Sequence, residues 1–520
     1  MYKVWDQSSA RMEGIGLSPG LSMSFTAKLI DLERNGKPSL TAQIVEVISE
    51  AISSGELAPG DQVPSTRELA ELASVNQLTA IRAYRQLRER GLVTAQVGRG
   101  TFVRETAQAA ETTNPEATEW QVYALPERLE TAQDRAVSEL TRHSAAPGTI
   151  PLSVGHPATG LLPAREVRDT LDRVLDELGP SVLQYAQTEG EPQLRAALAR
   201  HAAERGSPET AANVLVTSGA RQALSLIARA VIKPGEVAAC ESPSFVGSID
   251  ALRAAGATVR PLPVDEEGVD VGALEQLLQR HDVKLLFLQS RVQNPTGASL
   301  SERRADALIE LARRYSFFVV DDEVWAELAS KGADRPGLRS RDHGHVISVG
   351  SFSKVLGGGL RLGWILGSGP ILQHLSVGKR NDDTHTAVLI QLAIARLLEE
   401  GGLEEPLRRI RAALNERAEL FLRALEEHLA PLATWTEPSG ANVWVTLGER
   451  IDEHRLYAEA VRKGVTFVPG SAMMPGRPPR TQLRLSFGYV EPDQLEAGVK
   501  RLAGAIEEVR AETHVTIPVS

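Results

Sequence analysis

The chain has 520 residues, of which 42% are hydrophobic and 24% are charged, and its formal net charge is −10. The composition is that of a globular protein, and the length exceeds a single ordinary domain. The single cysteine, Cys240, excludes a disulfide framework within the chain, and its apolar surroundings predict a buried strand position. No run of about 18 apolar residues and no secretory leader pattern occur. These absences exclude a spanning helix and predict a cytoplasmic protein.

Charge is distributed unevenly near the N-terminus. Between Glu46 and Glu71 there are six acidic residues and one base, whereas between Arg82 and Arg104 there are six arginines and one acid. A basic stretch within an acidic protein indicates either a nucleic-acid contact or a solvated helix face.

Residues 1–38 show no sustained periodicity and are expected to form a tail. Residues 39–104 predict three short helices followed by a small hairpin, which is the pattern of a winged helix-turn-helix. Ser65 and Glu68 form a capping-box pattern at the start of the second helix. The third helix is expected from about Gln77 to Arg90, with an apolar face made of Leu78, Ile81, Tyr84 and Leu87.

The polar side of this third helix suits the major groove of double-stranded DNA. It carries Gln77, Thr79, Arg82 and Arg85, and Arg99 lies between two glycines at the predicted hairpin tip. From the pattern alone, a helical protein-interaction module is a close competing interpretation.

The segment 59–103 resembles the DNA-binding domain of the GntR regulator family. It contains Pro-Gly-Asp, Pro-Ser-x-Arg-x-Leu-Ala, Arg-Ala-Tyr-x-x-Leu, Gly-Leu-Val and Gly-x-Gly-Thr-Phe-Val. The resemblance implies DNA contacts at Arg67, Thr79, Arg82 and Arg99. Where the family often has an arginine this chain has Gln77, and glutamine pairs with adenine rather than guanine.

Residues 105–148 are polar and poor in aliphatic side chains, and we expect a flexible linker. Residues 149–520 alternate strand-like and helical patterns, which predicts an α/β domain with a mostly parallel sheet covered on both faces. Ligands of such folds bind at the carboxyl ends of the strands. From about residue 431 to 520 we expect a smaller α+β subdomain. The predicted strands of the large sheet are Val214–Thr217, Val237–Cys240, Val259–Pro261, Lys284–Gln289, Phe317–Val320, Val346–Val349 and Trp364–Leu366.

Several polar residues follow these strands. Lys354 comes after one of them, and two hydroxyls and a guanidinium near it, those of Ser351, Ser353 and Arg361, suit a phosphate. Ser218-Gly219-Ala220 opens a helix, whose free backbone N–H groups also suit a phosphate.

The string SFSKVLGGGLRLGW resembles the lysine segment of fold-type I, class I aminotransferases, and the resemblance extends from about Gly155 to the C-terminus. It implies that Lys354 is the catalytic lysine and holds pyridoxal 5′-phosphate (PLP) as a Schiff base. Asp322, chosen over Asp321 by the pattern Asp-Glu-Val-x, would bind the pyridinium nitrogen. We expect Asp321 to cap a helix or face solvent.

The same resemblance implies further roles. Asn294 would contact the phenolic oxygen of PLP, Phe245 would stack on its ring, and Tyr185 would reach the phosphate of a neighbouring subunit in a homodimer. Arg484 would bind the carboxylate of a substrate or effector. Trp325 and Phe245 stand where the family usually has tyrosines, which weakens the case for efficient transamination but not for PLP binding. No metal site is predicted.

A winged helix, a long linker and an aminotransferase-like domain in this order resemble the MocR subgroup of GntR regulators. The resemblance implies a sequence-specific transcription regulator that senses PLP or a small amino-containing effector through Lys354. The alternative is a working aminotransferase with an accessory DNA-binding domain. For such a regulator we expect reciprocal coupling, in which the effector changes the affinity for DNA and DNA changes the affinity for the effector by the same factor.

Overall fold

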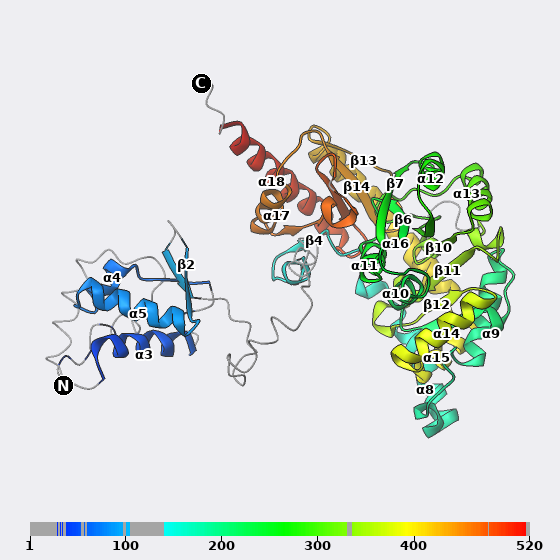
Figure 1. The fold of residues 1–520 in the computed structure, drawn as a ribbon, viewed down its shortest axis with the longest axis horizontal. Coiled ribbons are helices and arrows are strands. Elements are labelled where there is room, and N and C mark those ends of the chain that lie inside the picture. The colour runs from blue at the N-terminus through cyan, green and yellow to red at the C-terminus, as the bar shows by residue number, and fades with distance from the viewer. Residues whose placement is uncertain are drawn as a thin grey trace. The chain divides into compact units, whose positions relative to one another are not determined.

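The computed structural model describes residues 38–53, 60–96, 100–103, 140–329, 335–476 and 478–515, with Leu29, Leu32, Arg34 and Leu57. The chain forms two compact units, Met1–Arg128 and Leu129–Ser520 (Figure 1). The predicted tail, apart from Leu29, Leu32, Arg34 and residue 38, lies outside the described residues, as do residues 105–139 of the predicted linker and Arg99.

The N-terminal unit is a small helical domain with a three-stranded antiparallel sheet in the order β1-β3-β2. Its second helix starts with the predicted capping box, because Ser65 Oγ accepts from the Glu68 N–H and Glu68 reciprocally accepts from the Ser65 N–H. The predicted winged helix-turn-helix is therefore confirmed. Its elements are α3 (Leu40–Ser53), β1 (Gln62–Val63), α4 (Thr66–Leu72), α5 (Gln77–Glu89), β2 (Val93–Gln96) and β3 (Gly100–Val103).

The apolar face predicted for the third helix was partly wrong. Tyr84 and Leu87 are buried as expected, but Leu78 and Ile81 are exposed. The core side of α5 is completed instead by Ala80 and Ala83. These alanines fit at i, i+3, i+4 and i+7 with Tyr84 and Leu87, and small side chains let α5 pack closely on α3 and α4.

The second unit contains an eight-stranded sheet in the order β5-β12-β11-β10-β9-β6-β7-β8. Neighbours from β11 through β10, β9 and β6 to β7 are parallel, whereas β12 is antiparallel to both β11 and β5. The mostly parallel sheet is thus confirmed, with β12 reversed inside it and β8 antiparallel to β7 at its edge. Its strands are β5 (Val214–Thr217), β6 (Val237–Ser242), β7 (Thr258–Asp265), β8 (Gly268–Val269), β9 (Val283–Leu288), β10 (Phe318–Asp322), β11 (Val346–Ser351) and β12 (Gly363–Leu366).

Helices cover both faces of this sheet, because successive strand residues point to opposite sides. In β9, Leu285 and Phe287 join the core under α10, α11 and α14, whereas Leu286 and Leu288 join the core under α12 and α13. Cys240 is fully buried in β6, as expected. The covering helices are α8 (Ala164–Leu178), α9 (Pro192–Glu204), α10 (Ala220–Val231), α11 (Val246–Ala254), α12 (Val271–Leu278), α13 (Glu302–Tyr315), α14 (Pro370–Asp383) and α15 (Val388–Glu399).

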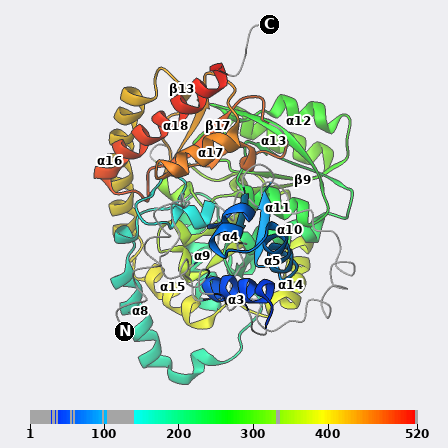
Figure 2. The ribbon, with the colours of Figure 1, turned by 90° about the vertical axis from the view of Figure 1, so that its left-hand side faces the viewer.

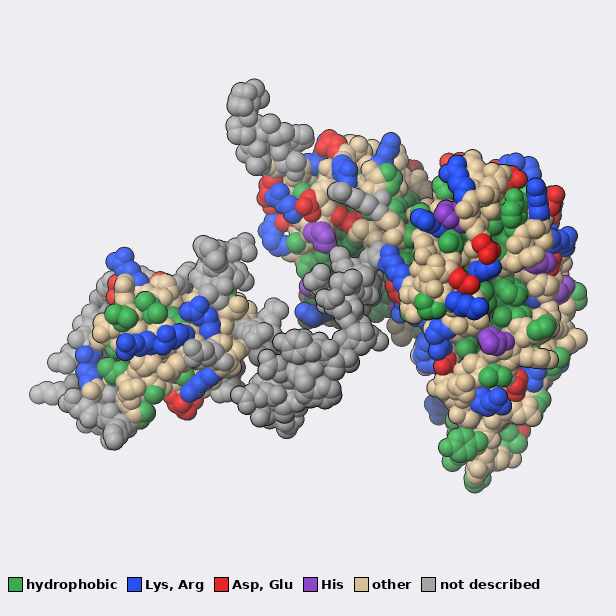
Figure 3. Space-filling model, in the orientation of Figure 1, with side chains coloured by type: hydrophobic (Ala, Val, Ile, Leu, Met, Phe, Trp, Pro, Cys, Tyr) green, Lys and Arg blue, Asp and Glu red, His purple; other side chains and the backbone are tan. Residues whose placement is uncertain are grey.

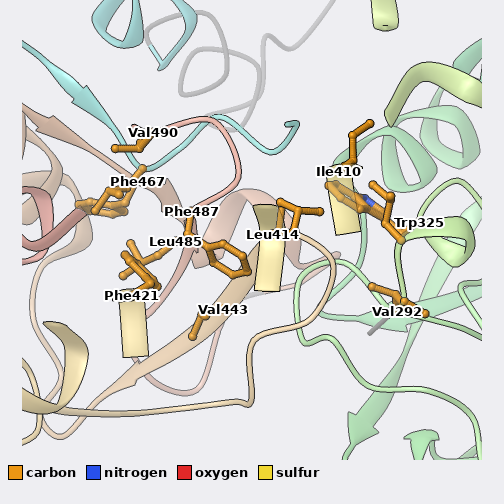
Figure 4. Close-up of a cluster of buried hydrophobic side chains, with 14 of the residues drawn as sticks. Val292, Trp325, Ile410, Leu414, Phe421, Val443, Phe467, Leu485, Phe487 and Val490 are labelled. Atoms are coloured by element: carbon orange, nitrogen blue, oxygen red, sulfur yellow. The ribbon is translucent and has the colours of Figure 1, made fainter. Parts of the chain in front are cut away.

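The C-terminal part adds a four-stranded antiparallel sheet in the order β13-β14-β17-β16. The helices α16, α17 and α18 belong to the same part of the chain (Figure 2). The long helix α16 joins this sheet to the large one, because Ile410 packs near Trp325 at one end while Phe421 packs on Phe487 at the other (Figure 4). The elements are α16 (Glu404–His428), β13 (Ala433–Trp435), β14 (Asn442–Leu447), α17 (Glu453–Arg462), β15 (Val465–Thr466), β16 (Val468–Pro469), β17 (Gln482–Ser486) and α18 (Leu495–Val515).

A two-residue strand near the start of the second unit, β4 (Ile150–Pro151), pairs with β15 in parallel. The chain therefore enters this unit beside the C-terminal sheet and then passes Ser153 and Gly155 on its way to α8. None of the described helices is long and apolar enough to cross a lipid bilayer.

Candidate functional site

Polar residues from three neighbouring strands meet at the carboxyl ends of β9, β10 and β11. Asn294 follows β9, Asp322 is the last residue of β10, and Lys354 ends the short 3-10 turn after β11. They share a cavity of about 490 Å³. Its lining residues are His156, Pro157, Leu162, Ala220, Arg221, Phe245, Gln289, Asn294, Asp322, Val324, Trp325, Ser353, Lys354, Gly358, Gly359 and Arg361.

Lys354 lines this cavity, and its amine has a defined hydrogen-bond partner. Its Nζ donates to the backbone oxygen of Gly155 at 2.7 Å and lies 4.9 Å from the centre of the Trp325 ring. Burial, together with the positive charge of Arg484, lowers the pKa of Lys354 to about 8, although the nearby Asp322 acts in the opposite direction. A lysine with this pKa is partly neutral near physiological pH, and the neutral amine is the nucleophilic form.

Asp322 presents a carboxylate to the same cavity. Burial raises its pKa to about 7, while the backbone N–H of Val324 and the amide of Gln289, which donate to it at 3.2 and 3.3 Å, act in the opposite direction. A buried carboxyl with this pKa gains from a cationic partner, which would hold it ionised.

The expectation that Asp321 caps a helix or faces solvent was wrong. Asp321 is fully buried and accepts hydrogen bonds from the backbone and hydroxyl of Ser290 and from the Leu338 N–H. Adjacent strand residues point to opposite faces, so Asp321 points away from the cavity that Asp322 enters.

Another part of the lining is basic, where Arg361 lies beside the start of α10. Arg361 has a left-handed backbone (φ 50°) and donates to the backbone oxygen of Ser218 at 2.9 Å. Gly219, with φ +97°, lies so close that a Cβ there would be 2.7 Å from Arg361 Nη2. Ala220 begins α10, whose N-terminus brings a partial positive charge to the same place.

The serines near Arg361 and the start of α10 have different roles. Ser353 lines the cavity, whereas the buried Ser351 donates to the Leu362 backbone oxygen at 2.7 Å and accepts from the Ser353 N–H. The N–H of Ser218 is taken by the Gln222 side chain, and its hydroxyl donates to Asp383. Ser351 and Ser218 therefore position their neighbours, and Ser353 faces the cavity.

Aromatic side chains form the walls. Phe245 lines the cavity and has the guanidinium of Arg221 at 5.9 Å from its ring centre. Trp325 is buried and packs beside Val292 and Ile410 (Figure 4).

Among the lining residues that were not predicted from the sequence, three have polar side chains: His156, Gln289 and Arg221. Burial and the charge of Lys354 lower the pKa of His156. Gln289 immediately follows β9, so the rule that ligands bind at strand ends could have found it. His156 lies in a loop far from the other residues in sequence, and no local signal marks it.

Arg484, on β17, is a half-buried cation beside this cavity. Its Nη2 donates to the Ser153 backbone oxygen at 2.6 Å, its Nη1 approaches Asn294 Oδ1 at 3.4 Å, and its Nε is buried without a partner. Burial lowers the pKa of Arg484 to about 10, so it is still charged at neutral pH. Among the described residues it forms no ion pair with a carboxylate.

Tyr185 does not line the cavity. Its side chain is 88% exposed and meets the ring of His385 edge-on at 5.6 Å. Its contact with a neighbouring subunit stays a prediction.

In the N-terminal unit, Gln77 and Arg82 are exposed on α5. Thr79 is half-buried, and its backbone and hydroxyl both donate to the capping side chain of Asn76. Arg67 is exposed on α4 and pairs with Glu71 at 3.2 Å, an exposed ion pair of small energetic weight.

Comparisons with known proteins agree with this division. Residues 40–103 match the family model of the bacterial regulatory proteins of the gntR family, and residues 147–502 match that of the class I and II aminotransferases, a PLP-dependent family. An uncharacterized HTH-type transcriptional regulator of Bacillus subtilis, YisV, is 31% identical over 90% of this chain and 96% of its own length. The probable rhizopine catabolism regulatory protein MocR of Rhizobium meliloti is 26% identical over 92% and 96%.

Among solved structures, LysN, an alpha-aminoadipate aminotransferase of Thermus thermophilus, has a TM-score of 0.70 at 32% identity, covering 75% of this chain and 99% of that one. The second unit therefore has the fold of a fold-type I aminotransferase, and the first that of a GntR helix-turn-helix domain. Because one chain carries both, in this order, it belongs to the MocR subgroup of the GntR family of transcriptional regulators.

Proposed function

We propose that this regulator binds PLP covalently through Lys354 and that its aminotransferase-like unit senses PLP or an amino-containing effector and alters sequence-specific binding to double-stranded DNA. The observation that carries the proposal is Arg484, a half-buried guanidinium whose Nε is buried without a partner. It lies close enough to lower the pKa of Lys354 and has no carboxylate partner among the described residues. A buried charge is costly unless paired. An amino acid would supply the carboxylate to Arg484 and the amine to the reactive centre.

The residues around the cavity fit PLP. Arg361, Ser353 and the start of α10 form the basic end that a phosphate needs. Asp322 would gain the cationic partner that its raised pKa calls for, and Phe245 offers a ring face. When bound, PLP supplies an aldehyde that condenses with amines and a ring that withdraws electrons.

A working aminotransferase is the second candidate. Lys354 and Asp322 have pKa values of about 8 and 7, which suit proton transfer near neutral pH. Against it, the buried Trp325 brings no phenolic hydroxyl to Asn294. Many turnovers per site of an amino acid with a 2-oxo acid would support the enzyme.

DNA selection with the full chain tests the regulatory proposal. We expect one sequence to be enriched from a random duplex library, and Arg82→Ala to weaken binding to it by about 1–3 kcal/mol, because Arg82 is exposed on the helix expected in the major groove. Arg165→Ala, which removes an exposed arginine from the other unit, is the matched control. Absence of any enriched sequence would contradict sequence-specific regulation.

Gly219→Ala is expected to weaken PLP binding by about 10- to 100-fold, because the new Cβ would displace Arg361 and cost a charged hydrogen bond. Gly235→Ala is the matched control, since Gly235 has a similar φ of +89° but nothing within 4 Å of its Cβ. Both variants should lose stability through backbone strain. Titration of cofactor-free protein with PLP, beside thermal unfolding, separates the two effects. Equal PLP affinities in the two variants would refute the phosphate site.

A further inference from the structure

The exposed side of α5 carries two large hydrophobic side chains. Leu78 is 63% exposed and Ile81 is 48% exposed, and among the described residues of the N-terminal unit they are the large hydrophobic side chains open to solvent. Leu78 and Ile81 do not belong to the core, because the buried side of the helix is formed by Ala80, Ala83, Tyr84 and Leu87.

These two residues lie among polar and basic neighbours. Leu78, Ile81, Arg82 and Arg85 follow one another at i, i+3, i+4 and i+7, so they share one side of α5, and Gln77 adjoins Ile81 at i+4. On the face of this unit that Figure 3 presents, hydrophobic and basic side chains lie next to one another. The surface therefore fits a partner that presents small apolar groups flanked by negatively charged groups.

The major groove of DNA has this chemistry. Each thymine places its C5-methyl group in the groove, and phosphates line both edges. We infer that Leu78 and Ile81 contact thymine methyl groups and thereby restrict the half-site to A·T pairs at the positions they cover. Gln77 on the same side suits adenine, which such pairs also supply. The inference rests on the proposed DNA binding and specifies which bases are read.

A second copy of the chain is the competing occupant of this surface. A two-fold contact between two copies of this helix face would bring Arg82 and Arg85 of both copies into one interface, and the like charges disfavour it. The positive charge instead favours the phosphates of DNA.

Removing single methyl groups from the DNA tests the inference. The duplex enriched by the full-length protein is resynthesised with deoxyuridine replacing one thymine at a time, which removes the C5-methyl alone. At the contacted positions we expect about a fourfold loss of affinity, the equivalent of one buried methyl group. In Leu78→Ala one of these positions should become insensitive to the replacement, and in Ile81→Ala another should.

Leu183→Ala is the matched control, because Leu183 is 79% exposed in the other unit, and it should leave every sensitivity unchanged. Leu78 and Ile81 are exposed, so their alanine variants should keep the thermal midpoint of the parent.

The outcomes separate the inference from the proposed function. If the protein enriches a sequence but no thymine position responds, or the variants respond like the parent, the thymine contacts are refuted and DNA recognition stands. If Leu78→Ala instead changes the oligomeric state, the surface binds a second copy. If no sequence is enriched, sequence-specific binding fails and the inference fails with it.

Discussion

Lys354→Ala is expected to abolish covalent attachment of PLP. Lys354 is the amine that lines the cavity, and burial together with Arg484 lowers its pKa to about 8, which makes it reactive with an aldehyde. After borohydride reduction and proteolysis, the parent should carry one modified peptide, which contains Lys354, and the variant should carry none. Lys233→Ala, which removes an exposed lysine, should behave as the parent.

The rate of PLP attachment to Lys354 is also expected to depend on pH. Because burial disfavours the charged ammonium, the neutral form of Lys354 grows about tenfold per pH unit below pH 8 and levels off above it. Attachment to cofactor-free protein should accelerate in the same way. A modified peptide from another lysine, or persistent attachment in Lys354→Ala, would show that the cavity is not the PLP site.

Arg484→Ala is expected to remove the influence of a carboxylate-bearing effector on DNA affinity. Loss of a hydrogen-bonded charge should cost about 1.5–3 kcal/mol of effector binding. The quantity to measure is the ratio of DNA dissociation constants with and without each member of a panel of amino acids. In the parent this ratio departs from one for the effector, and in the variant it should return to about one. PLP attachment, measured separately, shows that the cavity is intact.

Arg484→Lys is the matched control for charge. It keeps the cation but loses the planar fork that binds a carboxylate at two points, so an intermediate ratio is expected. Reciprocity gives a second test, because DNA must change effector affinity by the same factor. If Arg484→Ala responds to the effector as the parent does, Arg484 is not the carboxylate anchor, and the proposed signalling through a carboxylate bound at Arg484 is refuted.

Local patterns predicted most of the fold. Seven of the eight large-sheet strands showed as short apolar runs, whereas the two-residue edge strand β8 was not predicted. Asp322, Asn294 and Lys354 could be placed at strand ends, because the carboxyl ends of parallel strands share one edge. The same logic failed where two similar arrangements compete. Leu78 and Ile81 fit a helical apolar stripe as well as Ala80 and Ala83 do, and only packing against α3 and α4 decides which stripe is buried.

Asp321 and Asp322 show the same limit at one strand end. Both follow a buried apolar run. The two-residue period of a strand predicts that their side chains point to opposite faces of the sheet, but it does not tell which face holds the cavity.

By itself, the sequence determined that a helix-turn-helix domain precedes an α/β domain of the PLP-dependent type. Each signal for these domains, namely the turn residues, the strand-like runs and the lysine segment, is a short continuous stretch of the chain. Tertiary structure alone decided which distant residues share the cavity. Gly155, Lys354 and Arg484 meet there because β17 of the small sheet lies beside the segment that enters the second unit. This packing buries Lys354, which lowers its pKa, and it places no carboxylate beside Arg484 among the described residues. The residues next to Lys354 and Arg484 in the sequence do not reveal either property.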